Sequence, residues 1–239
     1  MPFPLAHPAA VLSLRRYCPR WLSLPALIIG SLSPDMGYAF GALRVQDFSH
    51  RLFDGLLFCL PAGLLALIVF HRLCPLVVRC LPDVYRRELL PLSQHPLGSP
   101  WILIVSLLIG AVTHLLLDSF THKDGWMTEH LAVLQFPLYE HGHRTFRVCH
   151  ILWYLCSFVG IIWVCLVYQE WLAKVGASAQ VASGRARFGN AVLLAVAVMV
   201  MSGSHYLTRH WWANFVEGAF TLLILLVFVL RAGALSKAK

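Results

Sequence analysis

Charged residues are scarce in this chain of 239 residues: Asp, Glu, Lys and Arg together make up 13%, whereas 59% of the residues are hydrophobic. A typical soluble domain is about half apolar and about a quarter charged. The scarcity of charge therefore excludes a disordered chain and an ordinary soluble globule. Together with a mean hydropathy of +0.70, it indicates an integral membrane protein.

Several motifs that would point to other classes of protein are also missing. The seven cysteines form no CxxC pair, and four of them (Cys59, Cys149, Cys156 and Cys165) lie inside apolar segments. We interpret them as small hydrophobic residues, not as a disulfide framework or a zinc knuckle. The sequence has no phosphate-binding glycine loop, no serine nucleophile elbow and no basic surface interleaved with aromatics, so we expect no nucleic-acid partner.

Long charge-free runs are present instead, and each is nearly long enough to cross a bilayer. They cover residues 55–70, 101–117, 148–168 and 188–204, and a further run at 213–230 is interrupted only by Glu217. A membrane-spanning helix needs about 20 apolar residues, and no segment alternates as a barrel strand would. The sequence predicts an all-α, polytopic transmembrane bundle with about five spanning helices, forming a single integral membrane domain over residues 1–239.

The N-terminal segment has a different pattern. The apolar stretches 8–17 and 21–33 are too short to span a membrane, and Pro19 separates them. We expect two short helices that form an antiparallel hairpin and bring His7 and Asp35 to the same end. Residues 1–168 would then form the core of the domain, and residues 188–232 would add two C-terminal spans.

The distribution of basic residues predicts the orientation. The Arg15–Arg20 turn, loop 71–100, linker 169–187 and the C-terminus carry 13 of the 19 Lys and Arg residues, and the remaining segments carry six. Because basic loops stay on the cytoplasmic side, we expect a cytoplasmic C-terminus in a multi-pass protein of the bacterial inner membrane. The net charge of +8 then indicates contact with anionic membrane lipid.

The end of the run at 101–117 carries the most informative motif. His114, Asp118 and His122 follow one another at intervals of four residues, which places them on one face of a helix. Ionisable residues at the end of a charge-free span are costly, so they are candidates for function. Imidazole and carboxylate are ligands for Zn²⁺, Mn²⁺ and Fe²⁺, although the same residues could instead cap the helix or bond to one another.

In the predicted topology, further candidate ligands reach the same membrane surface. His7 opens the first short helix, Asp35 follows Pro34 at the end of the second, and His50 precedes the next span. Together with His114, Asp118 and His122 they would supply a metal shell of three histidines and two aspartates, with one further histidine left over. Each of the added residues also has a structural interpretation, as a helix start, a turn residue or a loop residue.

The order of these motifs resembles that of a known family. The segments MPFPLAHPAAVLSLRR, LSLPALIIGSLSPD, SH before LFDGLLFCLPAGLL, and SLLIGAVTHLLLDSFTH resemble the DUF4184 family of uncharacterised bacterial membrane proteins, over roughly residues 1–165. That family is similar in motif order to membrane-bound metal-dependent hydrolases and, distantly, to zinc-dependent phospholipase C. The resemblance implies metal-site positions at His7, Asp35, His50, His114 and Asp118, with His122 adjacent. The hydrolases often carry PDxDH, whereas Met36-Gly37 follows Asp35 here, which argues against a two-metal site.

Two classes of function remain open from the sequence. In the first, a divalent metal, with zinc as the first choice, activates water at the outer leaflet and the protein hydrolyses a phosphoester or lipid-linked substrate, with Asp118 as the general base. In the second, the same His/Asp cluster serves ion or proton transport, or only holds helices together in a non-enzymatic membrane protein. Loop 122–147 could cover the site and bind an anionic head group through Arg144 and Arg147, or could be a solvated loop.

Overall fold

The computed structural model describes residues 3–18, 20–36, 48–50, 54–80, 83–141 and 144–174, and this part of the chain is nearly all helical. The predicted helical membrane bundle is therefore confirmed for these residues. The linker after residue 174 and the two expected C-terminal spans lie outside the described residues. By their contacts, the described residues up to Val69 and from Leu97 to Gly160 form one compact unit, while the described residues of 70–96 and 161–174 belong to a second.

Three long helices carry the membrane-spanning character of the described part of the chain. They are α5 (Asp54–Arg79), α7 (Pro100–Thr121) and α10 (Val148–Lys174). The segments Asp54–Arg79, Pro100–His130 and Val148–Trp171 are long and apolar enough to cross a membrane. All three were expected from charge-free runs, but each helix extends beyond its run because helical hydrogen bonding continues into the flanking polar residues.

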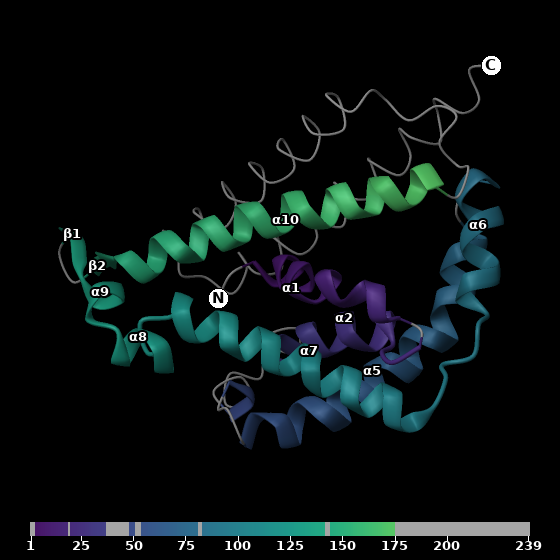
Figure 1. Cartoon of the computed structure of the whole chain (residues 1–239), viewed down its shortest axis with the longest axis horizontal. Helices are drawn as coiled ribbons and strands as arrows, with labels where there is room; N and C mark the ends of the chain where they lie inside the picture. Colours follow the sequence, from purple (N-terminus) through teal and green to yellow (C-terminus); the bar gives the residue numbers. More distant parts are fainter. Residues whose placement is uncertain are drawn as a thin grey trace, which may run out of the picture. The chain divides into compact units, whose positions relative to one another are not determined.

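Short helices build the predicted N-terminal hairpin. The first arm consists of η1 (Pro4–Ala6), α1 (Pro8–Leu12) and η2 (Ser13–Tyr17), and the second of α2 (Leu24–Leu32) and η3 (Ser33–Asp35). Buried Val11, Leu22 and Leu27 hold the two arms together. In Figure 1 both arms, drawn in purple, lie against α7, and α2 makes the most extensive contact with it.

Helices α2 and α7 run parallel in a fixed register. The backbone N–H of Ser23 donates to the hydroxyl of Ser106 (2.9 Å), and the carbonyl of Ser31 lies 2.7 Å from Nδ1 of His114. Both pairs are separated by 83 residues in the sequence. The same offset relates Asp35 to Asp118, so this register brings the two carboxylates to the same level at one end of the helix pair.

Two glycines make this close approach possible. A Cβ atom at Gly30 would collide with the backbone of Leu107, and one at Gly110 would collide with the backbone of Leu27 and Ser31. Small residues let helix backbones approach closely. In lipid, where the hydrophobic effect does not drive helices together, this close packing stabilises their association. A hydrophobic cluster lies beside this contact between α2 and α7 and also includes a residue of α5. Its buried members are Ala26 of α2, Leu67 of α5, and Leu103 and Leu107 of α7.

The connections between the long helices are more ordered than expected. Loop 71–100 contains the end of α5 and the helix α6 (Asp83–Ser93). Loop 122–147 contains α8 (Trp126–His130), α9 (Ala132–Gln135) and an antiparallel hairpin of β1 (Pro137–His141) and β2 (Arg144–Arg147). The strands pair Tyr139 with Phe146 and Glu140 with Thr145, with an irregular register between Pro137 and Tyr139. The sequence analysis missed this hairpin because a short two-stranded ribbon has no long alternating pattern.

Candidate metal site

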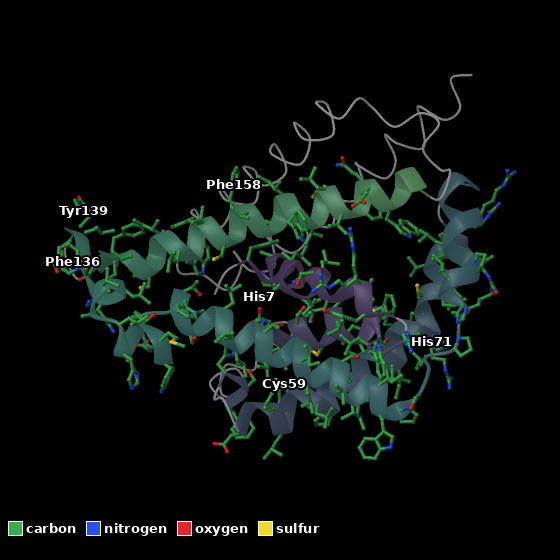
Figure 2. All side chains as sticks on the ribbon, in the orientation of Figure 1. His7, Cys59, His71, Phe136, Tyr139 and Phe158 are labelled. Carbon is green, nitrogen blue, oxygen red and sulfur yellow. The ribbon has the colours of Figure 1, made fainter. Side chains whose placement is uncertain are left out.

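Five side chains that the sequence analysis selected converge in the first unit of the structure. They come from the start of α1, the end of η3, the turn before α5 and the last two turns of α7, and they are His7, Asp35, His50, His114 and Asp118. The register of α2 on α7 places both aspartates at one end, and the hairpin returns His7 to that end. His7 can be followed in Figure 2, beside α7.

Two imidazoles and two carboxylates form the centre of this cluster. Nε2 of His50 lies 3.4 Å from Oδ1 of Asp35 and 3.3 Å from Oδ2 of Asp118. Nε2 of His114 lies 3.5 Å and 3.3 Å from the same two oxygens. Because zinc binds nitrogen and oxygen at about 2.0–2.2 Å, neighbouring donors around a four-coordinate ion are about 3.3–3.5 Å apart. The four distances match that spacing.

The third imidazole approaches from the other side of Asp118. Nε2 of His7 lies 3.7 Å from Oδ1 of Asp118, so the two oxygens of this carboxylate face different histidines. The rings of His7 and His114 stack with their centroids 3.7 Å apart and an angle of 15° between their planes. Two stacked imidazoles at this distance repel each other when both are protonated, so the stack favours neutral rings, which is the form that binds metals.

Most of these polar groups are buried and lack hydrogen bonds. His7 and His114 are 1% exposed, and Asp118 and Asp35 are 5% and 7% exposed. Within the described part of the chain, both ring nitrogens of His7, Nε2 of His114 and all four carboxylate oxygens have no hydrogen-bond partner. Buried polar groups are normally satisfied, and an unpaired buried carboxylate is costly, so the cluster requires a cation or protons between its members.

Backbone and hydroxyl groups behind the cluster fix which ring nitrogen faces it. Nδ1 of His114 lies 2.7 Å from the carbonyl oxygen of Ser31, to which it can only donate, so Nε2 carries the lone pair when the ring is neutral. The hydroxyl of Ser49 donates to the carbonyl of Pro34 (2.7 Å) and therefore accepts from Nδ1 of His50 (3.2 Å). In both rings Nε2 thus faces the carboxylates as a potential metal ligand.

The pKa values of His7 and His50, the two histidines of the cluster that lie outside the spanning helices, are shifted in opposite directions. Burial of the ring, together with the neighbouring His114, lowers the pKa of His7 to about 3 despite the attraction of the carboxylates. Burial acts in the same direction on His50, but the carboxylates of Asp118 and Asp35 that face its ring outweigh this effect and raise the pKa of His50 to about 9. A proton held on His50 would partly neutralise the two carboxylates that face it.

The chemistry of the donors defines two overlapping groups that could hold a metal ion. One consists of His7, His114 and Asp118, the other of Asp35, His50 and His114, and in each the donor atoms lie within 4.8 Å of one another. His114 belongs to both, and its Nδ1 is engaged with Ser31. Because one ring nitrogen binds one ion, His114 cannot serve two separate ions, and the groups are best read as one shell.

His122 is placed differently from the other candidates. The helix ends at Thr121, and His122 is its C-cap, with extended backbone angles (φ −100°, ψ 142°) and a backbone N–H that still donates to the carbonyl of Asp118. Its ring turns back, and Nδ1 lies 3.1 Å from the carbonyl oxygen of Asp118 and 3.7 Å from Oδ1 of the same residue. Neither of the two groups found among the described residues includes His122.

The sequence analysis did not identify the residues that support the cluster. Gly30 and Gly110 permit the helix contact, and Ser31 and Ser49 orient the histidines. A pattern in the sequence does point to the contact. Ala26 and Gly30 on α2, and Ser106 and Gly110 on α7, are pairs of small residues four positions apart, which is typical of closely packed membrane helices.

Fold and site together define a helical membrane protein with a buried His/Asp cluster that could hold a metal ion. The chain belongs to the DUF4184 family: the model of that family, described as a domain of unknown function, matches residues 1–236. The match extends beyond residue 165, where the resemblance was expected to end, so the C-terminal segment also belongs to the family region. No curated protein and no solved structure matches the chain significantly.

Proposed function

We propose that this protein is a metal-dependent hydrolase of the bacterial inner membrane that binds zinc between His50, His114, Asp35 and Asp118 and acts on a phosphoester or lipid-linked substrate. The observation that carries the proposal is the arrangement of acceptors: two Nε2 atoms of defined tautomer face two carboxylates at 3.3–3.5 Å. In a buried site, imidazole lone pairs that face carboxylate oxygens are unfavourable unless a cation lies between them. Mixed imidazole and carboxylate donors suit zinc, the first choice here, and also Fe²⁺ and Mn²⁺.

The residues of the chain divide into two roles in this proposal. A divalent ion held here would polarise the scissile group and lower the pKa of a bound water toward about 7. Oδ2 of Asp118 faces His50 and His114, which leaves Oδ1, on the side of His7 and His122, to accept a proton as the general base. Two partly exposed side chains, His50 of the cluster at 21% and the adjacent His122 at 32%, lie on the side from which we propose that substrate and water enter.

The depth of the cluster favours a hydrolase over a transporter. The 22 residues of α7 correspond to about 33 Å of helix, close to the thickness of a hydrocarbon core of about 30 Å. Asp118 lies three residues and His114 seven residues before the end of α7, which corresponds to about 5 and 10 Å below that end. A site for alternating access lies near the midplane, whereas a hydrolase needs access from one side.

A proton-binding site is the second candidate. The raised pKa of His50 supports this second candidate, because a protonated imidazole that faces two carboxylates can take the place of a cation. In that case the cluster would relay protons or only hold the N-terminal hairpin on α7. Metal analysis of the detergent-purified full chain separates the two functions, followed by assays with phospholipids and phosphoesters. The hydrolase proposal fails if the protein retains no transition metal and alanine substitution of the five cluster residues leaves its stability unchanged.

Removing the hydroxyl that orients His50 should weaken metal binding without abolishing it. In Ser49→Ala, Nδ1 of His50 loses its acceptor, and groups that orient a metal-binding histidine typically contribute about 10–100-fold to affinity. We expect a loss of that size in a competition titration with a chelator. Ser119→Ala is the matched control, because its hydroxyl bonds only to the carbonyl of Leu116 in its own helix (2.6 Å). Equal affinities of both variants would contradict the assigned tautomer.

The proposed orientation has a direct test at the end of α7. Asp124 is on the exposed turn after this helix, with a side chain that is 79% exposed. We expect a cysteine at this position to react with an impermeant maleimide in intact spheroplasts, and a reporter fused after Lys239 to be active only in the cytoplasm. Labelling of position 124 only after permeabilisation would invert the topology and place the cluster at the cytoplasmic leaflet.

A further inference from the structure

The segment between α7 and α10 exposes an unusual number of large apolar side chains. Six of them are between 42% and 66% exposed: Trp126, Leu131, Val133, Phe136, Leu138 and Tyr139. Figure 2 labels Phe136 and Tyr139 at the edge of this segment. Residues 126–139 are called the ledge below. Soluble surfaces rarely collect so many exposed aromatic and aliphatic residues in one short segment.

Internal hydrogen bonds hold the ledge in shape, so its apolar side chains are not free to fold inward. Arg147 donates from Nη1 to the backbone carbonyl of Gln135 (2.8 Å) and to its side-chain oxygen (3.2 Å), and the Gln135 amide donates to the carbonyl of Lys123 (3.2 Å). The interior is already filled by Thr128 and Leu134, which are buried. Arg147 therefore has a structural role at this end, whereas the sequence analysis considered it as a ligand for anionic head groups.

The position of the ledge places it at a membrane surface. It begins five residues after the end of α7 and ends nine residues before the start of α10, and both helices belong to candidate membrane spans. The adjoining helix turns expose apolar side chains as well, Leu116 on α7 and Ile151 on α10. A segment that joins neighbouring spans over this distance lies at the level of the lipid head groups, where Trp and Tyr are enriched.

The charges around the ledge indicate which kind of lipid it contacts. Lys123 and Asp124 form an exposed pair (3.6 Å), Glu129 and Glu140 are exposed on the ledge and its hairpin, and β2 adds Arg144 and Arg147, which makes three basic and three acidic residues. These residues carry no excess of positive charge, so electrostatic attraction to anionic lipid or to an acidic protein is not favoured. Burial of the apolar side chains would therefore supply the free energy of contact with the lipid.

We propose that the ledge inserts its aromatic and aliphatic side chains into the head-group layer of the bilayer, and that its partner is a zwitterionic phospholipid surface. The ledge is attached to the cluster through α8, which packs on α7: the hydroxyl of Thr128 donates to the carbonyl of Ser119 (3.1 Å), one residue after Asp118. Insertion of the ledge holds this end of α7 at the membrane surface. This inference does not depend on metal binding or on catalysis.

An environment-sensitive fluorophore on the ledge tests the proposal. The full chain with Cys80→Ser, which removes the exposed cysteine of the described residues, is reconstituted in phosphatidylcholine vesicles after labelling at Val133→Cys or, as the matched control, at Glu129→Cys. The signal of the parent protein without an added cysteine is subtracted. We expect nitroxide-labelled phosphatidylcholine to quench the label at position 133 at least about two-fold more strongly than the label at position 129, and aqueous iodide to show the reverse order.

Two other outcomes would overturn the proposal. If iodide reaches positions 133 and 129 equally, the ledge is a solvated loop. If the label at position 133 is protected from both quenchers, protein covers it, either another segment of this chain or a second copy. Phe136→Cys provides a second site, because Phe136 is 60% exposed, and it should repeat the pattern of position 133.

Discussion

Replacing Asp118 by alanine is expected to abolish metal retention. Its two oxygens approach four imidazoles, Oδ2 facing His50 and His114 and Oδ1 facing His7 and His122, so a single substitution removes a donor that all of these rings share. His114→Ala should have the same effect, because His114 belongs to both groups that could hold an ion. We expect each variant to lose more than about 100-fold in affinity, more than the loss of a merely orienting group, measured as metal content after dialysis against a weak chelator.

Matched controls for these variants lie a few residues away. Asp124→Ala removes a carboxylate that is exposed and pairs only weakly with Lys123, and His130→Ala removes an imidazole that bonds to the carbonyl of Trp126 in its own helix. Both should retain the wild-type metal content. If Asp118→Ala binds metal as well as Asp124→Ala, the cluster does not hold the ion, and the proton-binding function takes its place.

Gly110→Ala is expected to destabilise the protein and weaken metal binding together. The added methyl group would meet the backbone of Leu27 and Ser31, which cannot move without separating α2 from α7. Overpacking a tight contact typically costs about 1–3 kcal/mol. Because the same contact carries the bond from His114 to Ser31 and the register of Asp35, the separation also misplaces two donors. Thermal unfolding in detergent and metal content after dialysis measure the two effects.

Gly63→Ala is the control for this variant, since it makes the same chemical change in a spanning helix. Its Cβ would meet no backbone atom: it would approach the side-chain end of Leu107 to 3.0 Å and the Cβ of Ser33 to an ordinary 3.7 Å, so only a methyl group has to give way. Alanine is also preferred over glycine in helices by about 1 kcal/mol, a gain that both variants share. We expect Gly63→Ala to be neutral or slightly stabilising. Equal stabilities of the two variants would show that α2 and α7 do not require their close contact.

Part of the site follows from the sequence because it depends on local geometry. The charge-free run before Asp118 requires a helix in lipid, where the backbone must bond internally, and helical periodicity then puts His114 and Asp118 on one face. The same periodicity predicted His122 on this face, and its ring does lie 3.7 Å from Oδ1 of Asp118, although His122 itself is the C-cap beyond the last helical residue. The helix ends one residue earlier, since Thr121 is followed by a polar turn at the end of the span, and periodicity does not indicate where a helix stops.

By itself, then, the sequence determined a helical membrane protein, the hairpin that returns the chain from His7 to Asp35, and the chemical types of the donors. Only the tertiary structure decided that His7, Asp35 and His50 meet the end of α7, and which nitrogen of each ring faces the carboxylates. The physical reason is that this arrangement depends on a backbone contact at Gly30 and Gly110 and on the carbonyl of Ser31. Backbone groups are the same in every residue, so their partners are set by packing between distant segments and not by the local pattern of side chains.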